Sequence, residues 1–133
     1  MSHKLRIDLW PPSANSIWRN IQGRTLLSKS ARHFYRHAPW MVKSQAPGVH
    51  YEIAQPVEVR LTLRPPSKRA YDIDNRAKAT LDALVKAGIL ADDRQVSRLI
   101  LEKGLPIDGG QVLVEIAEYA SEKEPSIGQR ACR

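Results

Sequence analysis

Two pairs of aspartates flank the most regular helical pattern in the sequence. Asp72 and Asp74 come just before it, separated by Ile73, and Asp92 and Asp93 come after it. In extended backbone, residues i and i+2 point to the same side, so the first two carboxylates can face one point. If the chain folds back after the helix, the second pair can join them. Converging carboxylates repel each other, and a Mg²⁺ ion would relieve that repulsion while keeping positions for water and a phosphate.

Each aspartate also has an ordinary structural explanation. An Asp before a helix is usually an N-terminal cap, and an Asp-Asp pair in a turn is usually solvated. The surrounding charge favours the metal interpretation, because a metal-dependent phosphodiesterase needs cations for the phosphates beside carboxylates for the ion. Five basic residues crowd this segment: Arg64, Lys68, Arg69, Arg76 and Lys78.

Lys78 is a candidate catalytic cation. It lies four residues after Asp74, about one helical turn onward, from where it could stabilise charge that develops on a scissile phosphate. The alternative is an i,i+4 ion pair with Asp82, which would contribute only a few tenths of a kcal/mol. The spacing does not separate these two roles.

A further candidate DNA contact lies nearer the N-terminus. Trp18, with Arg19, Asn20 and Arg24, could stack on a splayed base and hold nearby phosphates at a branch point. A Trp in so short a chain is more often part of the core, so we expect Trp18 to pack. The basic residues within 32–37 suit a DNA backbone or a solvated helix face equally well.

Alternation of apolar and polar residues predicts the strands that must position these groups. It predicts a half-buried strand at residues 5–9 and the clearest one at 57–63. Two more strands are expected at 96–101 and 111–119. The Asp-Gly pair in the connection at 106–110 favours a hairpin-type turn between them.

Helical spacing of apolar residues predicts two helices. The stronger pattern covers residues 77–85, with Asp74 or Asn75 as the expected N-cap. The other begins at Ser28, and Pro39 is expected to end or kink it, because proline lacks the N–H that the helix needs.

The remaining segments are expected to be irregular. Residues 13–27 and 44–56 carry glycine, proline and polar groups, and 121–133 are expected to be a disordered tail. The order strand, helix, strand, helix, strand, strand predicts one compact mixed α/β (α+β) domain over residues 1–120. About four strands in a mixed sheet and two main helices make up this domain.

Composition limits the classes of partner and of chemistry. The 133 residues carry 21 Lys and Arg against 14 Asp and Glu, a net charge of +7 that favours a polyanionic partner. The single cysteine, Cys132, excludes a disulfide framework within the chain and a thiolate metal cluster. The first residues lack the apolar run of a signal peptide, and no stretch is long enough to span a membrane. We therefore expect a cytoplasmic protein with no membrane partner.

Two separated motifs, in matching order and spacing, resemble those of the RusA family of Holliday junction resolvases. The resemblance covers residues 5 to about 119. The motifs are Trp10-Pro11-Pro12-Ser13 with Asn15, Gly23-Arg24-Thr25 and Ser28, and Asp72-Ile73-Asp74-Asn75 with Lys78, Leu81-Asp82-Ala83-Leu84, Lys86-Ala87-Gly88 and Asp92-Asp93.

The resemblance implies a dimeric, Mg²⁺-dependent endonuclease that acts on four-way junctions. By motif, Asp72, Asp74 and Asp93 correspond to the family's essential carboxylates and Lys78 to its important lysine. Asp92 occupies the adjacent acidic position and is given a supporting role. The expected DNA contacts come from the distribution of basic residues and are Arg64, Lys68, Arg69, Arg76, Arg19 and Arg24.

Two other functions remain open at this point. One is a less selective branched-DNA or flap nuclease on the same scaffold, and the other is a non-catalytic DNA-binding protein. Three carboxylates near phosphate would weaken the affinity of a pure binder, so they favour an enzyme. Sequence leaves open the cleavage preference, the number of metal ions, the phage or host role, the dimer interface and the role of the tail.

Overall fold

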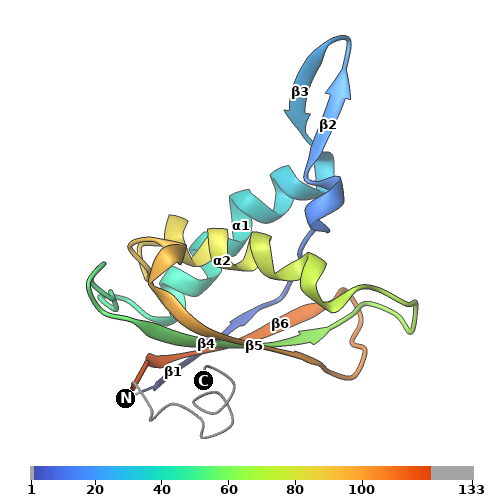
Figure 1. Ribbon diagram of the computed structural model, residues 1–133. Helices are drawn as coiled ribbons and strands as arrows, with labels where there is room; N and C mark the ends of the chain where they lie inside the picture. The colour runs from blue at the N-terminus through green and yellow to red at the C-terminus, as the bar shows by residue number, and fades with distance from the viewer. Residues whose placement is uncertain (1, 121–133) are drawn as a thin grey trace, which may run out of the picture.

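A computed structural model describes residues 2–120, and the predicted tail at 121–133 lies outside the described residues. One four-stranded sheet carries both helices on the same face (Figure 1). No helix within 2–120 has the length and apolar character needed to cross a bilayer. The predicted mixed α+β fold with two main helices is confirmed.

The sheet combines antiparallel and parallel pairing. Its order is β1 (Ser2–Ile7), β6 (Gln111–Glu118), β4 (Val57–Arg64) and β5 (Val96–Lys103). β6 pairs antiparallel with both β1 and β4, whereas β5 pairs parallel with β4. Buried and partly exposed residues alternate along all of β4, as the period of a one-sided strand requires.

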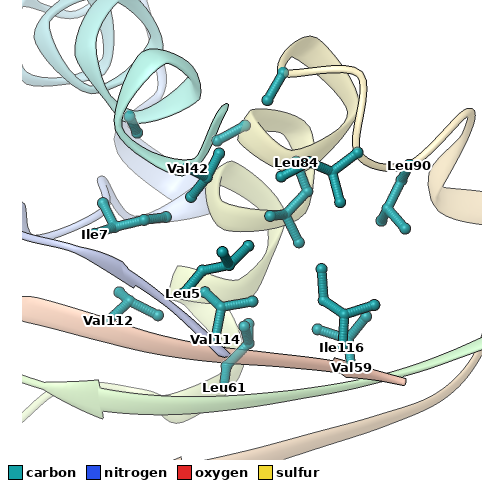
Figure 2. Packing of buried hydrophobic residues seen from close by; sticks show 14 of the residues in the cluster. Leu5, Ile7, Val42, Val59, Leu61, Leu84, Leu90, Val112, Val114 and Ile116 are labelled. Atoms are coloured by element: carbon teal, nitrogen blue, oxygen red, sulfur yellow. The ribbon is translucent and has the colours of Figure 1, made fainter. Parts of the chain in front are cut away.

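The core fills the space between the sheet and two helices, α1 (Lys29–Gln45) and α2 (Ala77–Lys86). Figure 2 shows the apolar side chains of the strands pointing toward the helices. β1, β4 and β6 supply most of the strand contribution, and Leu84 and Val42 represent the helices. The fully buried strand residues include Ile7, Val57, Val59, Leu61, Leu63, Val112 and Ile116.

Pro39 was predicted to end or kink the first helix, and the prediction that the helix ends there is wrong. α1 continues through Pro39 to Gln45, six residues beyond the proline. The buried stripe of Ala31, Phe34, Ala38 and Val42 runs past the proline on the same face, so packing offsets the missing backbone hydrogen bond.

The expectation of irregular structure over residues 13–27 is also wrong. A short 3-10 turn, η1 (Ala14–Ser16), leads into a hairpin of β2 (Trp18–Ile21) and β3 (Arg24–Leu27). Gln22 and Gly23 form the two-residue turn and both have positive φ (51° and 76°), as type I′ hairpin turns require. The hairpin projects away from the sheet and helices (Figure 1).

β5 and β6 do not form the hairpin predicted around residues 106–110, because β4 lies between them. β4, α2 and β5 instead form a strand–helix–strand unit, whose parallel pairing fixes β5 to one edge of β4. β6 then pairs with the other edge. Gly110 allows the connection to pass close to Trp10, since an added Cβ would lie 2.6 Å from the Trp10 Cβ.

Candidate nuclease site

Asp72 and Asp74 lie in the segment that leads into α2. A 3-10 turn, η2 (Ile73–Arg76), precedes the helix. Asp72 comes immediately before this turn and has an extended backbone conformation. The Asp72 side chain makes no capping hydrogen bond; its Oδ2 accepts only from the Asn75 side-chain amide at 3.3 Å. Both carboxylates are exposed. They are therefore accessible to a ligand.

Neither Asp74 nor Asn75 caps α2, contrary to prediction. The residue before the helix is Arg76, whose side chain makes no capping hydrogen bond. Because the 3-10 turn already continues the backbone into the helix, a side-chain cap is not needed at this point. The common structural explanation for an aspartate before a helix thus does not account for Asp74.

The second acidic pair has divided roles. Asp92 caps the 3-10 turn η3 (Asp93–Gln95): its Oδ1 accepts from the Arg94 N–H at 2.8 Å and lies 3.2 Å from the Arg94 guanidinium Nε. Gln95 completes a capping box, and its amide also donates to the Glu52 carbonyl at 2.7 Å. Asp92 therefore shapes the turn, and Asp93 is left exposed beside it.

Of the two carboxylates, Asp93 has the environment that is less favourable for ionisation. A hydrogen bond shared with Asp92, partial burial and the negative charges of Asp92 and Asp82 raise the pKa of Asp93, while Lys78 opposes the shift. The backbone N–H of Arg94 is the main cause that lowers the pKa of Asp92. A cation at this point would relieve the repulsion at Asp93.

A cavity of about 410 Å³ lies beside α2, between the base of the hairpin and the turn after the helix. Inside it, the Lys78 Nζ lies 3.6 Å from Asp82 Oδ2, which also accepts from the Tyr35 hydroxyl at 2.8 Å. The predicted Lys78–Asp82 pair therefore exists. The lining residues are Ile17, Trp18, Leu27, Tyr35, Lys78, Asp82, Val85, Lys86, Asp92 and Asp93.

The structure brings some predicted site residues together and leaves others apart. Lys78, Asp92 and Asp93 share the cavity, whereas Asp72 and Asp74 are not among its lining residues. The two acidic pairs lie beyond opposite ends of α2, whose ten residues span roughly 15 Å. Within residues 2–120, no three His, Cys, Asp or Glu side chains gather closely enough to hold a metal. One chain thus presents two acidic pairs rather than one cluster.

The predicted DNA-contact residues differ in their solvent exposure and in the contacts they make within the protein. Lys68 and Arg69 are exposed on the connector after β4, and Arg19 and Arg24 are exposed on the hairpin. Each of these four side chains extends from a loop or a projecting strand and is open to solvent. Their placement is compatible with contacts to a DNA backbone.

The guanidinium groups of Arg64 and Arg76 donate hydrogen bonds within the protein. Arg64 donates to the Leu105 carbonyl and to the Gln111 side chain, both at 3.1 Å. Arg76 donates to the Pro11 carbonyl at 2.7 Å and its guanidinium lies 5.2 Å from the Trp10 ring centroid. Burial lowers the pKa of Arg76, as expected for a cation held inside the protein. These contacts favour a structural role for Arg76.

Trp18 does not pack in the core as expected. Its side chain is 59% exposed at the base of the hairpin, where it lines the cavity that contains Asp93. The residue that sequence reasoning passed over is Tyr35, whose helical register on α1 brings its hydroxyl to Asp82 from 47 positions away. No local sequence signal marks that contact.

Comparison with known proteins identifies the family. The model of the family described as "Endodeoxyribonuclease RusA" matches residues 9–117. The crossover junction endodeoxyribonucleases of Enterobacteria phage 82 and of Escherichia coli strain K12 are each 34% identical over 113 residues, which is 85% of this chain and 92% of the relative. The corresponding protein of Escherichia coli O139:H28 is 32% identical over the same length. The chain therefore belongs to the RusA family of endodeoxyribonucleases.

Proposed function

We propose that this protein is a Holliday junction endonuclease that hydrolyses phosphodiester bonds at four-way DNA junctions with the help of Mg²⁺. The observation that carries the proposal is that Lys78 and the exposed carboxylate Asp93 line one cavity of a strongly basic chain. The family membership and the names of the relatives support the same reaction. The proposed DNA substrate makes the cytoplasm the expected location.

The available donors fit Mg²⁺. This ion prefers oxygen ligands, and it commonly takes one or two carboxylates and completes its shell with water and substrate phosphate. Asp72, Asp74 and Asp93 would hold it once the two acidic pairs are brought together, and Asp92 would maintain the turn that presents Asp93. When bound, the ion supplies a Lewis acid next to the scissile phosphate.

The remaining work falls to the chain's own residues. The Lys78 ammonium would lie against the phosphate and stabilise the charge that builds up on its oxygens during in-line attack. In the free protein that ammonium lies against Asp82, which also accepts a hydrogen bond from the Tyr35 hydroxyl. Trp18, at the mouth, offers a face for a base that is unstacked at the branch point.

We also propose a two-fold symmetric homodimer. Two symmetric cuts need two sites, and isologous pairs are the commonest oligomers. The proposed contact is β1, because it is an edge strand of the sheet and an open edge invites pairing, and the segment after Pro12 is the alternative contact. Sedimentation of free and junction-bound protein tests this proposal. A monomer of 15.0 kDa in both states would overturn it.

The separation of the acidic pairs makes the dimer relevant to chemistry. A site that uses Asp72, Asp74 and Asp93 together needs movement, the substrate or a second copy between the two pairs. Mixing Asp72→Asn chains with Asp93→Asn chains distinguishes the last possibility. If a second copy completes the site, mixed dimers regain one intact site and nick the junction; if each site belongs to one chain, the mixture stays inactive.

The decisive experiment is cleavage of a synthetic four-way junction with and without Mg²⁺, with linear duplex and flap controls. We expect paired cuts on the junction that require Mg²⁺. Asp74→Asn should abolish cutting and keep or tighten binding, because it removes a ligand and a negative charge near phosphate. Asp108→Asn, an exposed aspartate in the connection between β5 and β6, is the matched control.

Each outcome of that experiment supports one interpretation. Equal cutting of flap and junction would favour the less selective nuclease. Junction binding without cutting at any Mg²⁺ concentration would favour the non-catalytic DNA-binding protein. A fully active Asp74→Asn variant would show that the site is assigned wrongly.

A further inference from the structure

The distribution of charge along the chain is strongly uneven. Between Leu9 and Tyr51 the sequence contains no Asp or Glu, although it contains nine basic or titratable nitrogen side chains. This acid-free segment forms the hairpin and all of α1. Its members are Arg19, Arg24, Lys29, Arg32, Arg36 and Lys43, with His33, His37 and His50.

Six basic side chains, five of them from this acid-free segment, gather around one hollow. Five come from exposed positions on α1 and the sixth from the end of α2: Lys29, Arg32, His33, Arg36, His37 and Lys86. We call this hollow the α1 groove. It adjoins the cavity that contains Asp93, and the two share Leu27, Tyr35 and Lys86 as lining residues. A DNA strand leaving the cavity would therefore pass directly into the α1 groove.

The groove is basic without internal neutralisation. Among residues 2–120, the structure gives Lys29, Arg32, Arg36 and Lys86 no ion pair, and Lys86 has only the Tyr35 ring at 5.3 Å. Most arginines and lysines with ion pairs lie on the sheet or around the cavity: Arg6, Arg60, Lys78, Arg94 and Arg98. The α1 groove is thus a concave surface lined by basic side chains that have no acidic partner in the described residues.

This charge pattern is unfavourable for the helix that carries it. The first turn of α1 has no acidic residue and carries Lys29, although negative charge is favoured at a helix N-terminus. Arg32 and Arg36 are like charges at i,i+4, which repel each other. The pattern does not serve the stability of the free protein, and an anionic partner would relieve it.

We propose that the α1 groove holds the sugar-phosphate backbone of one DNA arm as that arm leaves the nuclease cavity. The inference rests on the proposed function and adds the path of the substrate. From Lys29 to Arg36 the helix rises roughly 10 Å, which matches about three phosphates of one strand at 3.4 Å each. Lysines and arginines that contact phosphates fix register without reading sequence, so the groove binds any arm.

The test compares two positions on the same helix. Arg32→Gln and Arg36→Gln, singly and together, remove cations from the α1 groove, and Lys43→Gln removes an exposed cation outside it, near the end of α1. Binding to a fluorescent junction and to linear duplex is measured without metal across a range of salt. Thermal melting checks that each variant folds.

The expected result follows from counterion release. Each lost phosphate contact lowers the salt slope by about 0.9, so the double variant should lose about 1.8. Raising salt from about 50 to 200 mM should then weaken the wild type roughly 12-fold more than the double variant, on junction and duplex alike. Lys43→Gln should keep the wild-type slope.

Two failures are distinguishable. If the double variant keeps the slope of Lys43→Gln while the wild type cuts junctions in Mg²⁺, the α1 groove is a solvated helix face and the proposed function stands. If the wild type neither binds nor cuts junctions, both the groove and the proposed function are overturned.

Discussion

Replacing Lys78 with alanine separates a catalytic role from a merely structural one. The structural role is limited by geometry: the Lys78 Nζ and Asp82 Oδ2 are 3.6 Å apart, and their side chains are 59% and 29% exposed. An i,i+4 pair of this kind contributes about 0.3–0.5 kcal/mol. We therefore expect the free energy of unfolding to fall by no more than about 0.5 kcal/mol, a change of roughly twofold in the unfolding equilibrium.

The catalytic role predicts a much larger effect on the reaction. Removing one preorganised group that stabilises developing charge typically lowers kcat by about 10²–10³, or roughly 2.7–4 kcal/mol. Single-turnover cleavage of a four-way junction at saturating protein measures this step, and metal-free titration measures binding. We expect Lys78→Ala to slow cleavage at least about a hundredfold while binding changes only severalfold.

Asp82→Asn is the matched control. It removes the same ion pair but keeps an oxygen that can accept the Tyr35 hydroxyl, and it leaves Lys78 free to contact phosphate. Cleavage by this variant should stay close to that of the wild type. Equal losses of rate in the two variants would refute the argument, because they would show that the ion pair matters rather than the lysine. A parallel loss of binding and rate in Lys78→Ala would make it an ordinary phosphate contact.

Three further variants test other parts of the surface. Trp18→Ala should weaken junction binding by about 1–3 kcal/mol if a base stacks on the exposed ring, whereas Trp40→Ala, 72% exposed on α1, should not; equal effects would refute stacking. Replacing Lys68 and Arg69 with glutamine should weaken binding to junction and duplex and lower the salt slope by about 1.8, and an unchanged slope would remove them from the interface. Mg²⁺ should raise the melting temperature of the wild type but not of Asp93→Asn. Because the pKa of Asp93 is raised in the folded protein, its ionisation destabilises the metal-free fold as pH rises, so Asp93→Asn should melt no lower than wild type at pH 7, and any advantage should vanish below about pH 3.

The strands and helices with one-sided burial were predictable from sequence. β4 alternates strictly between buried and partly exposed residues, and α2 buries residues at helical spacing, so periodicity found both. The β2–β3 hairpin was not predicted, because seven of its eight strand residues are exposed and they show no alternation of buried and exposed positions. Its only local signal is the turn at Gln22-Gly23.

Strand order needed an argument that spacing cannot supply. The turn chemistry at 106–110 suits a hairpin, but a strand–helix–strand crossover places β5 parallel to β4. With β5 on one edge of β4, β6 has to take the other edge, so the local turn signal gives way to the topology of the longer unit.

The candidate site was predictable in composition but not in the division of roles. The sequence marked all four aspartates, but the separate roles of Asp92, which caps η3, and Asp93, which is left exposed, were not predicted. The Asp-x-x-Gln spacing from Asp92 to Gln95 is a capping-box pattern, so this distinction had a local signal. The structural role of Arg76 had none, because its partner Pro11 is 65 residues away.

The acidic cavity and the basic groove have a common energetic property. At Asp93 the neighbouring carboxylates oppose ionisation, and along α1 like charges face each other without acidic partners in the described residues. Both arrangements work against the free fold, so the buried core between sheet and helices must offset them. A metal ion would relieve the first, and phosphates would relieve the second. The two are contiguous through Leu27, Tyr35 and Lys86. A DNA strand held in the groove would therefore bring a phosphate to the carboxylates, and each ligand would then strengthen the binding of the other.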